Sequence, residues 1–108
     1  MVSDVEHYQL PLPRLKAGAR LLIVVSPYYR AIADSLIRGA RATAQQVGAD
    51  CDLVEVPGAL EIPPAIALAA QSGRYDGFVA LGCVIRGETS HYETVCNDSS
   101  RGLMLLGL

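Results

Sequence analysis

The feature that most constrains the fold is a continuous apolar run at residues 20–25, RLLIVV, in which β-branched residues predominate. A strand with no polar alternation is typical of a parallel sheet whose two faces are both covered. Two further strand-like segments follow at residues 51–56 (CDLVEV) and 77–81 (GFVAL). The sequence therefore predicts three strands in a buried parallel sheet.

Helical patterns separate these strands. Between the first two, apolar residues recur at helical spacing from Ile32 to Val47, and Gly48 stands where a helix C-terminal glycine belongs. Gly39 lies inside this helix, where it costs about 1 kcal/mol relative to alanine, so we expect it to permit close packing. A second helix is predicted over residues 61–71, with its prolines in the first turn, and a third from near Ser90 to the end.

The resulting order is β-α-β-α-β-α, for which right-handed crossovers and a parallel sheet are the default. Ligands of open sheets of this kind bind beyond the carboxyl ends of the strands. The three segments that follow the strands are residues 26–30, 57–61 and 82–91. We expect these segments to converge at one edge of the sheet and to form the functional site.

Composition narrows the class of protein. The 108 residues suit one domain, and 51% hydrophobic with 19% charged residues indicates a globular chain. No apolar run approaches the length of a membrane span, and the first residues do not resemble a secretory signal. The net charge is −2 with scattered lysine and arginine, so nucleic acid is not expected as a ligand. Two histidines and three unclustered cysteines (Cys51, Cys83, Cys96) predict neither a metal site nor a disulfide framework, and fit a reducing cytoplasm.

The two ends of the chain differ from the middle. Residues 1–18 contain Pro11 and Pro13 among polar groups and are interpreted as an arm that precedes the domain at 19–108. The last residues, LMLLGL, are apolar, and a three-stranded sheet leaves edges exposed. We therefore expect that the domain is incomplete at its C-terminus as given, or that another chain covers this surface.

The loop after the third strand is richest in chemistry: residues 82–94 read GCVIRGETSHYET. Free N–H groups at a helix N-terminus bind anions, and the Thr89 hydroxyl adds a donor, so residues 87–89 predict a phosphate cradle. Glu88 is acidic, so its contribution would come from its backbone N–H. The same residues would also suit an ordinary helix cap by Thr89 or Ser90, and the P-loop pattern is absent.

His91 would lie in the first turn of the third helix. The positive helix end disfavours imidazolium, whereas a bound phosphate favours it, and a histidine balanced in this way can both accept and donate protons. A surface or capping histidine is the alternative.

The other two loops offer binding residues. Glu61 lies at a helix start, either as a favourable terminal charge or as an acceptor for ligand hydroxyls beside the backbone of Ala59 and Leu60. Tyr28 follows the first strand and would either stack on a flat heterocycle or pack in the core. Cys83 has no basic partner in the sequence, which favours a buried structural thiol over a nucleophile.

Together these segments resemble the lumazine synthase family. The matching stretches are VPGALEIP at residues 56–63, LGCVIRGETSHYE at 81–93 and VCN at 95–97, within a resemblance that covers residues 20–108. The resemblance implies a three-layer α/β/α sandwich around a parallel, flavodoxin-like sheet. It also implies a transferase of riboflavin biosynthesis that joins 5-amino-6-(D-ribitylamino)uracil to 3,4-dihydroxy-2-butanone 4-phosphate, releasing 6,7-dimethyl-8-ribityllumazine, phosphate and water without a cofactor or metal.

The resemblance also assigns roles. His91 matches the proton-transfer histidine, and Tyr28 matches the aromatic that stacks on the pyrimidine, a position where the family often has phenylalanine. Glu88 and Thr89 match the phosphate-binding pair. The remaining matches contact the pyrimidine ring or the ribityl chain: Ala59, Leu60, Glu61, Cys83, Val84 and Ile85.

Family members continue with a fourth strand and helices, which supply an arginine to the phosphate and an aromatic from a neighbouring subunit. The resemblance implies a homopentamer, which in some members builds an icosahedral shell. A non-catalytic flavin-binding or shell-forming scaffold of the same fold is the main alternative. A generic nucleotide-binding domain is a weaker one, because SPY at residues 26–28 replaces a G-x-G-x-x-G loop.

Overall fold

The computed structural model describes residues 10–87 and 90–107. Three parallel strands form one sheet in the order β2-β1-β3: β1 is Arg20–Val25, β2 is Asp50–Glu55 and β3 is Gly77–Leu81. The central strand β1 pairs with β2 from Arg20 opposite Asp50 and with β3 from Leu21 opposite Gly77. The parallel sheet predicted from the apolar runs is confirmed, with β2 beginning one residue earlier than expected.

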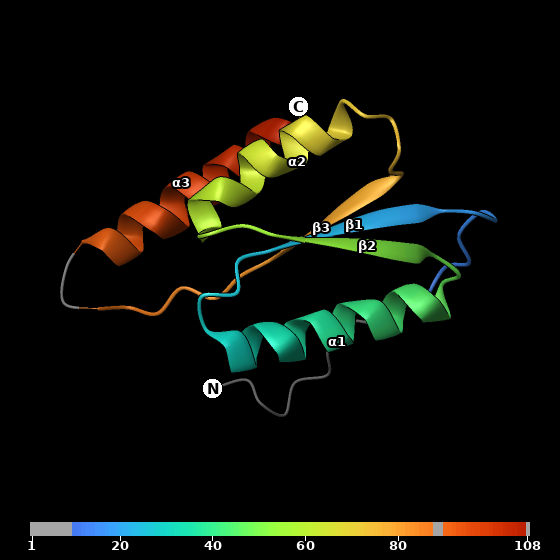
Figure 1. Ribbon diagram of the computed structural model, residues 1–108, viewed down its shortest axis with the longest axis horizontal. Coiled ribbons are helices and arrows are strands. Elements are labelled where there is room, and N and C mark those ends of the chain that lie inside the picture. The colour runs from blue at the N-terminus through green and yellow to red at the C-terminus, as the bar shows by residue number, and fades with distance from the viewer. Residues whose placement is uncertain (1–9, 88–89, 108) are drawn as a thin grey trace.

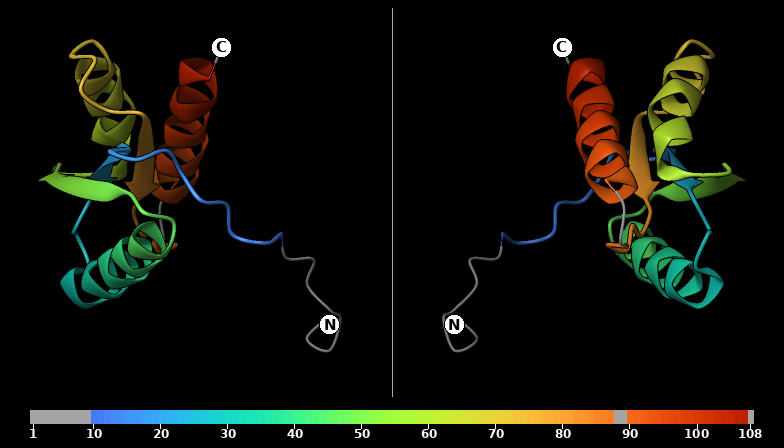
Figure 2. Two further views of the ribbon diagram at one scale, coloured as in Figure 1. Left: turned by 90° about the vertical axis from the view of Figure 1, so that its right-hand side faces the viewer. Right: turned by 90° about the vertical axis from the view of Figure 1, so that its left-hand side faces the viewer.

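Helices cover both faces of this sheet (Figure 1). Helix α1, Arg30–Gln46, lies on one face, while α2, Ile62–Ala70, and α3, His91–Leu106, lie together on the other. The three layers are also separate in both views of Figure 2, where the described part of the N-terminal segment leads away from the sheet. The α/β/α sandwich is therefore confirmed.

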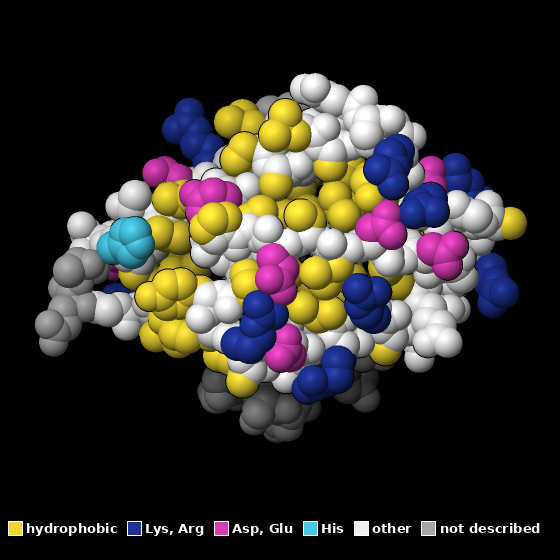
Figure 3. Space-filling view, in the orientation of Figure 1, with side chains coloured by type: hydrophobic (Ala, Val, Ile, Leu, Met, Phe, Trp, Pro, Cys, Tyr) yellow, Lys and Arg dark blue, Asp and Glu magenta, His cyan; other side chains and the backbone are white. Residues whose placement is uncertain are grey.

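The core has two halves because β1 is buried on both faces. Ile23 and Val25 pack against Ala33 of α1, and Leu22 and Val24 pack against Ile62 and Ile66 of α2. Ile23, Val24 and Val25 have no exposed surface, which explains why the strand is apolar after its first residue, Arg20. In the space-filling view of Figure 3, hydrophobic side chains lie between the layers, and acidic and basic side chains lie beside one another.

One glycine marks a helix end, and two others inside helices correct a prediction about packing. Gly48 follows α1 with a φ of 82°, a left-handed conformation that glycine adopts without strain, as predicted. Gly39 was expected to permit close packing, but a Cβ placed there would meet no atom within 4 Å. In α3, by contrast, a Cβ on Gly102 would stand 2.8 Å from Pro63 of α2, so the close approach of helices occurs there.

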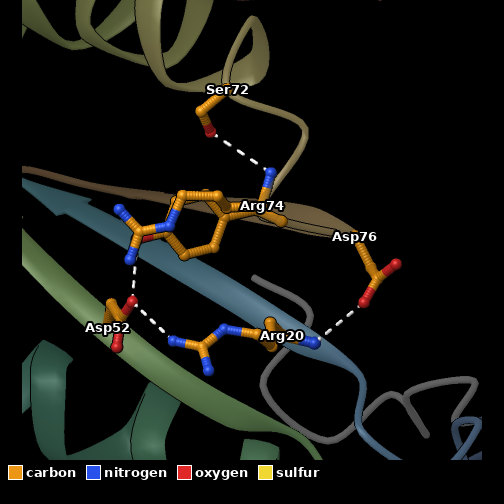
Figure 4. Close-up of polar contacts among 6 residues, drawn as sticks. Arg20, Asp52, Ser72, Arg74 and Asp76 are labelled. Carbon is orange, nitrogen blue, oxygen red and sulfur yellow. Dashed lines mark hydrogen bonds and ion pairs between the residues drawn. The ribbon is translucent and has the colours of Figure 1, made fainter.

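Polar contacts tie the three strands together at the amino ends of the sheet (Figure 4). Arg20 donates to the Asp52 carboxylate at 2.9 Å, and its backbone N–H donates to Asp76 at 2.9 Å. The Tyr75 hydroxyl also donates to Asp52, at 2.8 Å. These contacts join β1 to β2 and to the residues that precede β3. They lie at the opposite end of the sheet from the loops that follow the strands.

Candidate functional site

The loops that follow the three strands converge, as the topology predicted. In Figure 1 they lie at the left-hand end of the sheet, together with the first turns of all three helices. A cavity of about 440 Å³ lies between them. This volume falls within the range of small-molecule sites in proteins, roughly 300–1,000 Å³. Its lining residues are Ser26, Tyr28, Tyr29, Pro57, Gly58, Ala59, Leu60, Glu61, Cys83, Val84, Ile85, His91 and Val95.

Eight of the ten residues predicted from the sequence line this one cavity. They are Tyr28, Ala59, Leu60, Glu61, Cys83, Val84, Ile85 and His91. Glu88 and Thr89, predicted to bind phosphate, lie outside the described residues. The structure thus brings together residues that are up to 63 positions apart (28 to 91), while their roles remain predictions.

The first wall of the cavity comes from the end of β1. Ser26 is 6% exposed, and its backbone N–H donates to Leu81 of β3 at 3.0 Å, which fixes where this loop leaves the sheet. Tyr28 is 76% exposed and therefore lies at the rim, so the alternative of core packing is wrong. Its ring meets the edge of Tyr29 with centroids 5.0 Å apart, which makes an aromatic surface available beside the cavity.

The second wall comes from the loop after β2. A short 3₁₀ turn, Ala59–Glu61, precedes α2, so the helix begins one residue later than predicted. The absence of a side chain at Gly58 leaves room for Glu61: a Cβ on Gly58 would stand 2.9 Å from Glu61 Oε1. Gly58 therefore permits the Glu61 carboxylate to fold back over the loop at the cavity.

The third wall comes from β3 and the start of α3. His91 is the first residue of α3, as predicted. Of the two candidate caps, Ser90 precedes the helix but its side chain makes no capping hydrogen bond, and Thr89 lies outside the described residues. The Arg86 guanidinium lies 5.0 Å from the Tyr92 ring centroid and 3.8 Å from a Glu93 carboxylate oxygen. These contacts connect the loop before His91 to the helix residues that follow it.

Some lining residues were not predicted individually. Ser26 and Tyr29 lie in the first of the three segments expected to converge, and Gly58 lies in the second. Their position directly after a strand is the sequence feature that could have identified them as lining residues. Val95 comes from the second turn of α3, where it is 7% exposed, and only packing of α3 over the cavity reveals it.

Clusters of metal-ligating side chains and membrane-spanning helices were sought among the described residues. No group of three or more histidine, cysteine or acidic side chains suited to a metal occurs among residues 10–87 and 90–107. No helix in the same ranges is long and apolar enough to span a bilayer. Burial raises the pKa of the Cys51 thiol, which lies away from the cavity.

Comparison with known proteins gives a consistent picture. The family model for 6,7-dimethyl-8-ribityllumazine synthase matches residues 18–108. Proteins named 6,7-dimethyl-8-ribityllumazine synthase from Methylorubrum populi and Methylobacterium radiotolerans are each 54% identical over the whole chain. One from Zymomonas mobilis is 51% identical over 83% of it.

The chain spans 68%, 67% and 65% of the lengths of these three relatives, and 56% of another from Jannaschia. The match includes all three loops that line the cavity. The chain therefore belongs to the 6,7-dimethyl-8-ribityllumazine synthase family, a transferase family of riboflavin biosynthesis.

Proposed function

We propose that the protein condenses 5-amino-6-(D-ribitylamino)uracil with 3,4-dihydroxy-2-butanone 4-phosphate to give 6,7-dimethyl-8-ribityllumazine, phosphate and water. The observation that carries the proposal is one cavity at the carboxyl ends of the strands that has His91 and the seven other described site residues in its lining. Holding two small molecules side by side in such a cavity removes much of the entropic barrier to their reaction.

Each part of the cavity suits one part of the chemistry. Tyr28, exposed at the rim, is proposed to stack on the flat pyrimidine. Glu61 is proposed to accept hydrogen bonds from ribityl hydroxyls, together with the backbone of Ala59 and Leu60. The backbone of residues 83–85 offers N–H and C=O groups to the pyrimidine edge. Glu88 and Thr89, which lie outside the described residues, are proposed to hold the phosphate.

His91 is proposed to move the protons. The pyrimidine amine attacks the ketone to give a carbinolamine, which loses water to form an imine. Phosphate then leaves, and the second amine closes the ring with loss of another water. Because each step transfers a proton, an imidazole at the edge of the cavity can accept and return it, an effect typically worth about 10²- to 10⁴-fold in rate.

The direct test is to mix the two substrates with the full-length protein and to follow lumazine fluorescence. The proposal predicts product formation at a rate proportional to enzyme concentration. Binding of the pyrimidine without any product would instead favour the non-catalytic scaffold.

We further propose a homopentamer of a domain at residues 19–108 preceded by an arm at 1–18, acting in the cytoplasm. Exposed apolar side chains on α3, Met104 at 70% and Leu105 at 57%, support burial against other protein surface. The odd number and wide spacing of the cysteines in the sequence favour a reducing compartment. Native mass spectrometry would distinguish a pentamer from a shell or a monomer.

A further inference from the structure

The cavity has a charged contact just outside its lining. Arg30, the first residue of α1, donates two hydrogen bonds to the Glu55 carboxylate at the end of β2: Nη1 to Oε2 at 2.9 Å and Nη2 to Oε1 at 3.3 Å. Two parallel N–H···O contacts between a guanidinium and a carboxylate fix orientation as well as distance. We call this pair the Arg30–Glu55 clamp.

Both partners lie within two residues of the cavity walls in the sequence. Arg30 follows Tyr28 and Tyr29, which line the cavity from the β1 loop. Glu55 comes two residues before Pro57, where the second lining segment begins. Backbone hydrogen bonds hold the same two segments. Val56 N–H donates to the Val25 carbonyl at 2.9 Å, and Ala33 N–H donates to the Tyr29 carbonyl at 2.9 Å. The clamp therefore spans the two segments at the points where they leave regular structure.

The local structure of α1 explains a cation at this position only in part. A positive charge at a helix N-terminus opposes the helix dipole, and the first turn of α1 contains no acidic residue. Asp34, one turn later, lies 3.5 Å from Arg30, a longer contact than the one with Glu55. Glu55 is consequently the main partner: it raises the pKa of Arg30, while the hydrogen bonds from Arg30 lower the pKa of Glu55.

We propose that the Arg30–Glu55 clamp is a positioning device that sets the distance between the aromatic wall and the Ala59–Glu61 wall of the cavity, and so sets affinity for the pyrimidine substrate. The inference rests on the proposed function for its substrate and on the geometry alone for its placement. Both side chains are about half exposed, so their contribution to overall stability is small. The expected effect is therefore on substrate binding rather than on folding.

The fold offers a matched control. Arg20 of β1 and Asp52 of β2 form an ion pair at 2.9 Å with similar exposure, at the opposite end of the sheet from the cavity. Like the clamp, this pair anchors a side chain of β2 to a neighbouring element. Asp52 also accepts a hydrogen bond from Tyr75, so its replacement disturbs the sheet at least as much as loss of the clamp does, without touching either cavity wall.

The experiment compares Glu55→Gln, Arg30→Gln, the double variant and Asp52→Asn in the full-length protein. We expect each clamp variant to raise the KM for the pyrimidine about two- to fivefold, the size of an exposed ion pair, with kcat unchanged. The double variant should match the single ones, because the two residues act as one unit. Asp52→Asn should leave KM unchanged. Arg30→Lys, which keeps the charge but loses the fork, should be intermediate.

Amide hydrogen exchange gives a second readout that does not need activity. The clamp variants should speed exchange at residues 58–61 and at Tyr28 and Tyr29, whereas Asp52→Asn should not. Additive KM effects, an equal effect of Asp52→Asn, or unchanged exchange in the loops would overturn the clamp. If the unchanged protein forms no lumazine while the exchange pattern holds, the proposed function fails and the clamp as a loop-positioning device stands.

Discussion

The absence of a Cβ atom at Gly58 affects the position of Glu61 in the cavity. Its missing Cβ leaves the space in which Glu61 Oε1 lies, at 2.9 Å from where that Cβ would stand. The φ of Gly58 is −151°, an extended conformation open to any residue, so the backbone itself tolerates a side chain there. The glycine is needed for the neighbouring carboxylate rather than for the turn.

We therefore predict that Gly58→Ala moves the Glu61 carboxylate and weakens binding of the ribityl-bearing substrate. The loss should be about 2- to 10-fold in KM, as for a displaced hydrogen bond of about 0.5–1.5 kcal/mol. Steady-state kinetics and thermal denaturation would be measured together. A lower melting temperature with an unchanged KM would show that Glu61 does not contact substrate.

A second prediction for a single residue concerns Thr89, which lies outside the described residues. If it donates to phosphate, Thr89→Ala should raise the KM of the phosphorylated substrate about 5- to 10-fold, which corresponds to about 1–1.5 kcal/mol, and leave the KM of the pyrimidine nearly unchanged. Equal changes for both substrates would argue against a phosphate cradle at this turn.

Helix packing is the first question at the scale of elements. Gly102 of α3 faces Pro63 of α2, where an added Cβ would stand 2.8 Å from two ring carbons, whereas Gly39 of α1 has nothing within 4 Å. The same substitution should thus have opposite effects in the two helices. Gly39→Ala should stabilise the protein by about 0.5–1 kcal/mol through helix propensity. Gly102→Ala should destabilise it by about 1–3 kcal/mol because the helices must separate.

Urea denaturation of both variants checks this prediction. A stabilising Gly102→Ala would mean that α3 does not pack on Pro63 as described, and a destabilising Gly39→Ala would mean that another surface covers α1.

The elements themselves were largely accessible from the sequence. Residues 20–25 and 77–81 were predicted with their observed bounds, because an apolar β-branched run has one good solution in a covered parallel sheet. The 3₁₀ turn at Ala59–Glu61 was not predicted, since Pro63 and Pro64 mark a helix start without fixing its first residue. The sequence offered Thr89 or Ser90 as a helix cap, and Ser90 makes no capping hydrogen bond, because such a bond depends on side-chain geometry that residue type does not determine.

The convergence of the cavity residues could be predicted from the sequence, but the charge pair beside the cavity could not. Parallel strands place their following loops at one edge, so convergence of Tyr28, Glu61 and His91 followed from topology. The Arg30–Glu55 clamp did not, because it requires the register of β2 against β1 and the angle at which α1 leaves the sheet. Long-range charge pairs of this kind have no periodic signal in the chain.

Charge pairing at the two ends of the sheet shapes the response of the whole molecule to pH. Hydrogen bonds from Tyr75 and Arg20 lower the pKa of Asp52, Lys16 and the Arg20 backbone lower that of Asp76, and Arg30 lowers that of Glu55. A carboxyl whose pKa is lower in the folded state stabilises the fold above its unfolded pKa. That stabilisation is lost as the pH falls through the folded value.

We predict that stability is retained above about pH 4.5 and falls progressively as acid protonates these groups. Asp52→Asn should be less stable than the unchanged protein at pH 7, and the difference should shrink toward pH 2. Denaturation midpoints across this range measure it. A constant difference at all pH values would show that Asp52 stabilises through packing or through hydrogen bonds that do not depend on its charge.

The central claim is that His91, at the edge of the shared cavity, transfers the protons of the condensation. The most direct measurement is the turnover of His91→Ala in the full-length protein, with pyrimidine binding and assembly measured on the same sample. The account predicts a fall in kcat of about 10²- to 10⁴-fold with binding and assembly retained. Turnover equal to that of the unchanged protein would contradict it and would remove His91 from the mechanism.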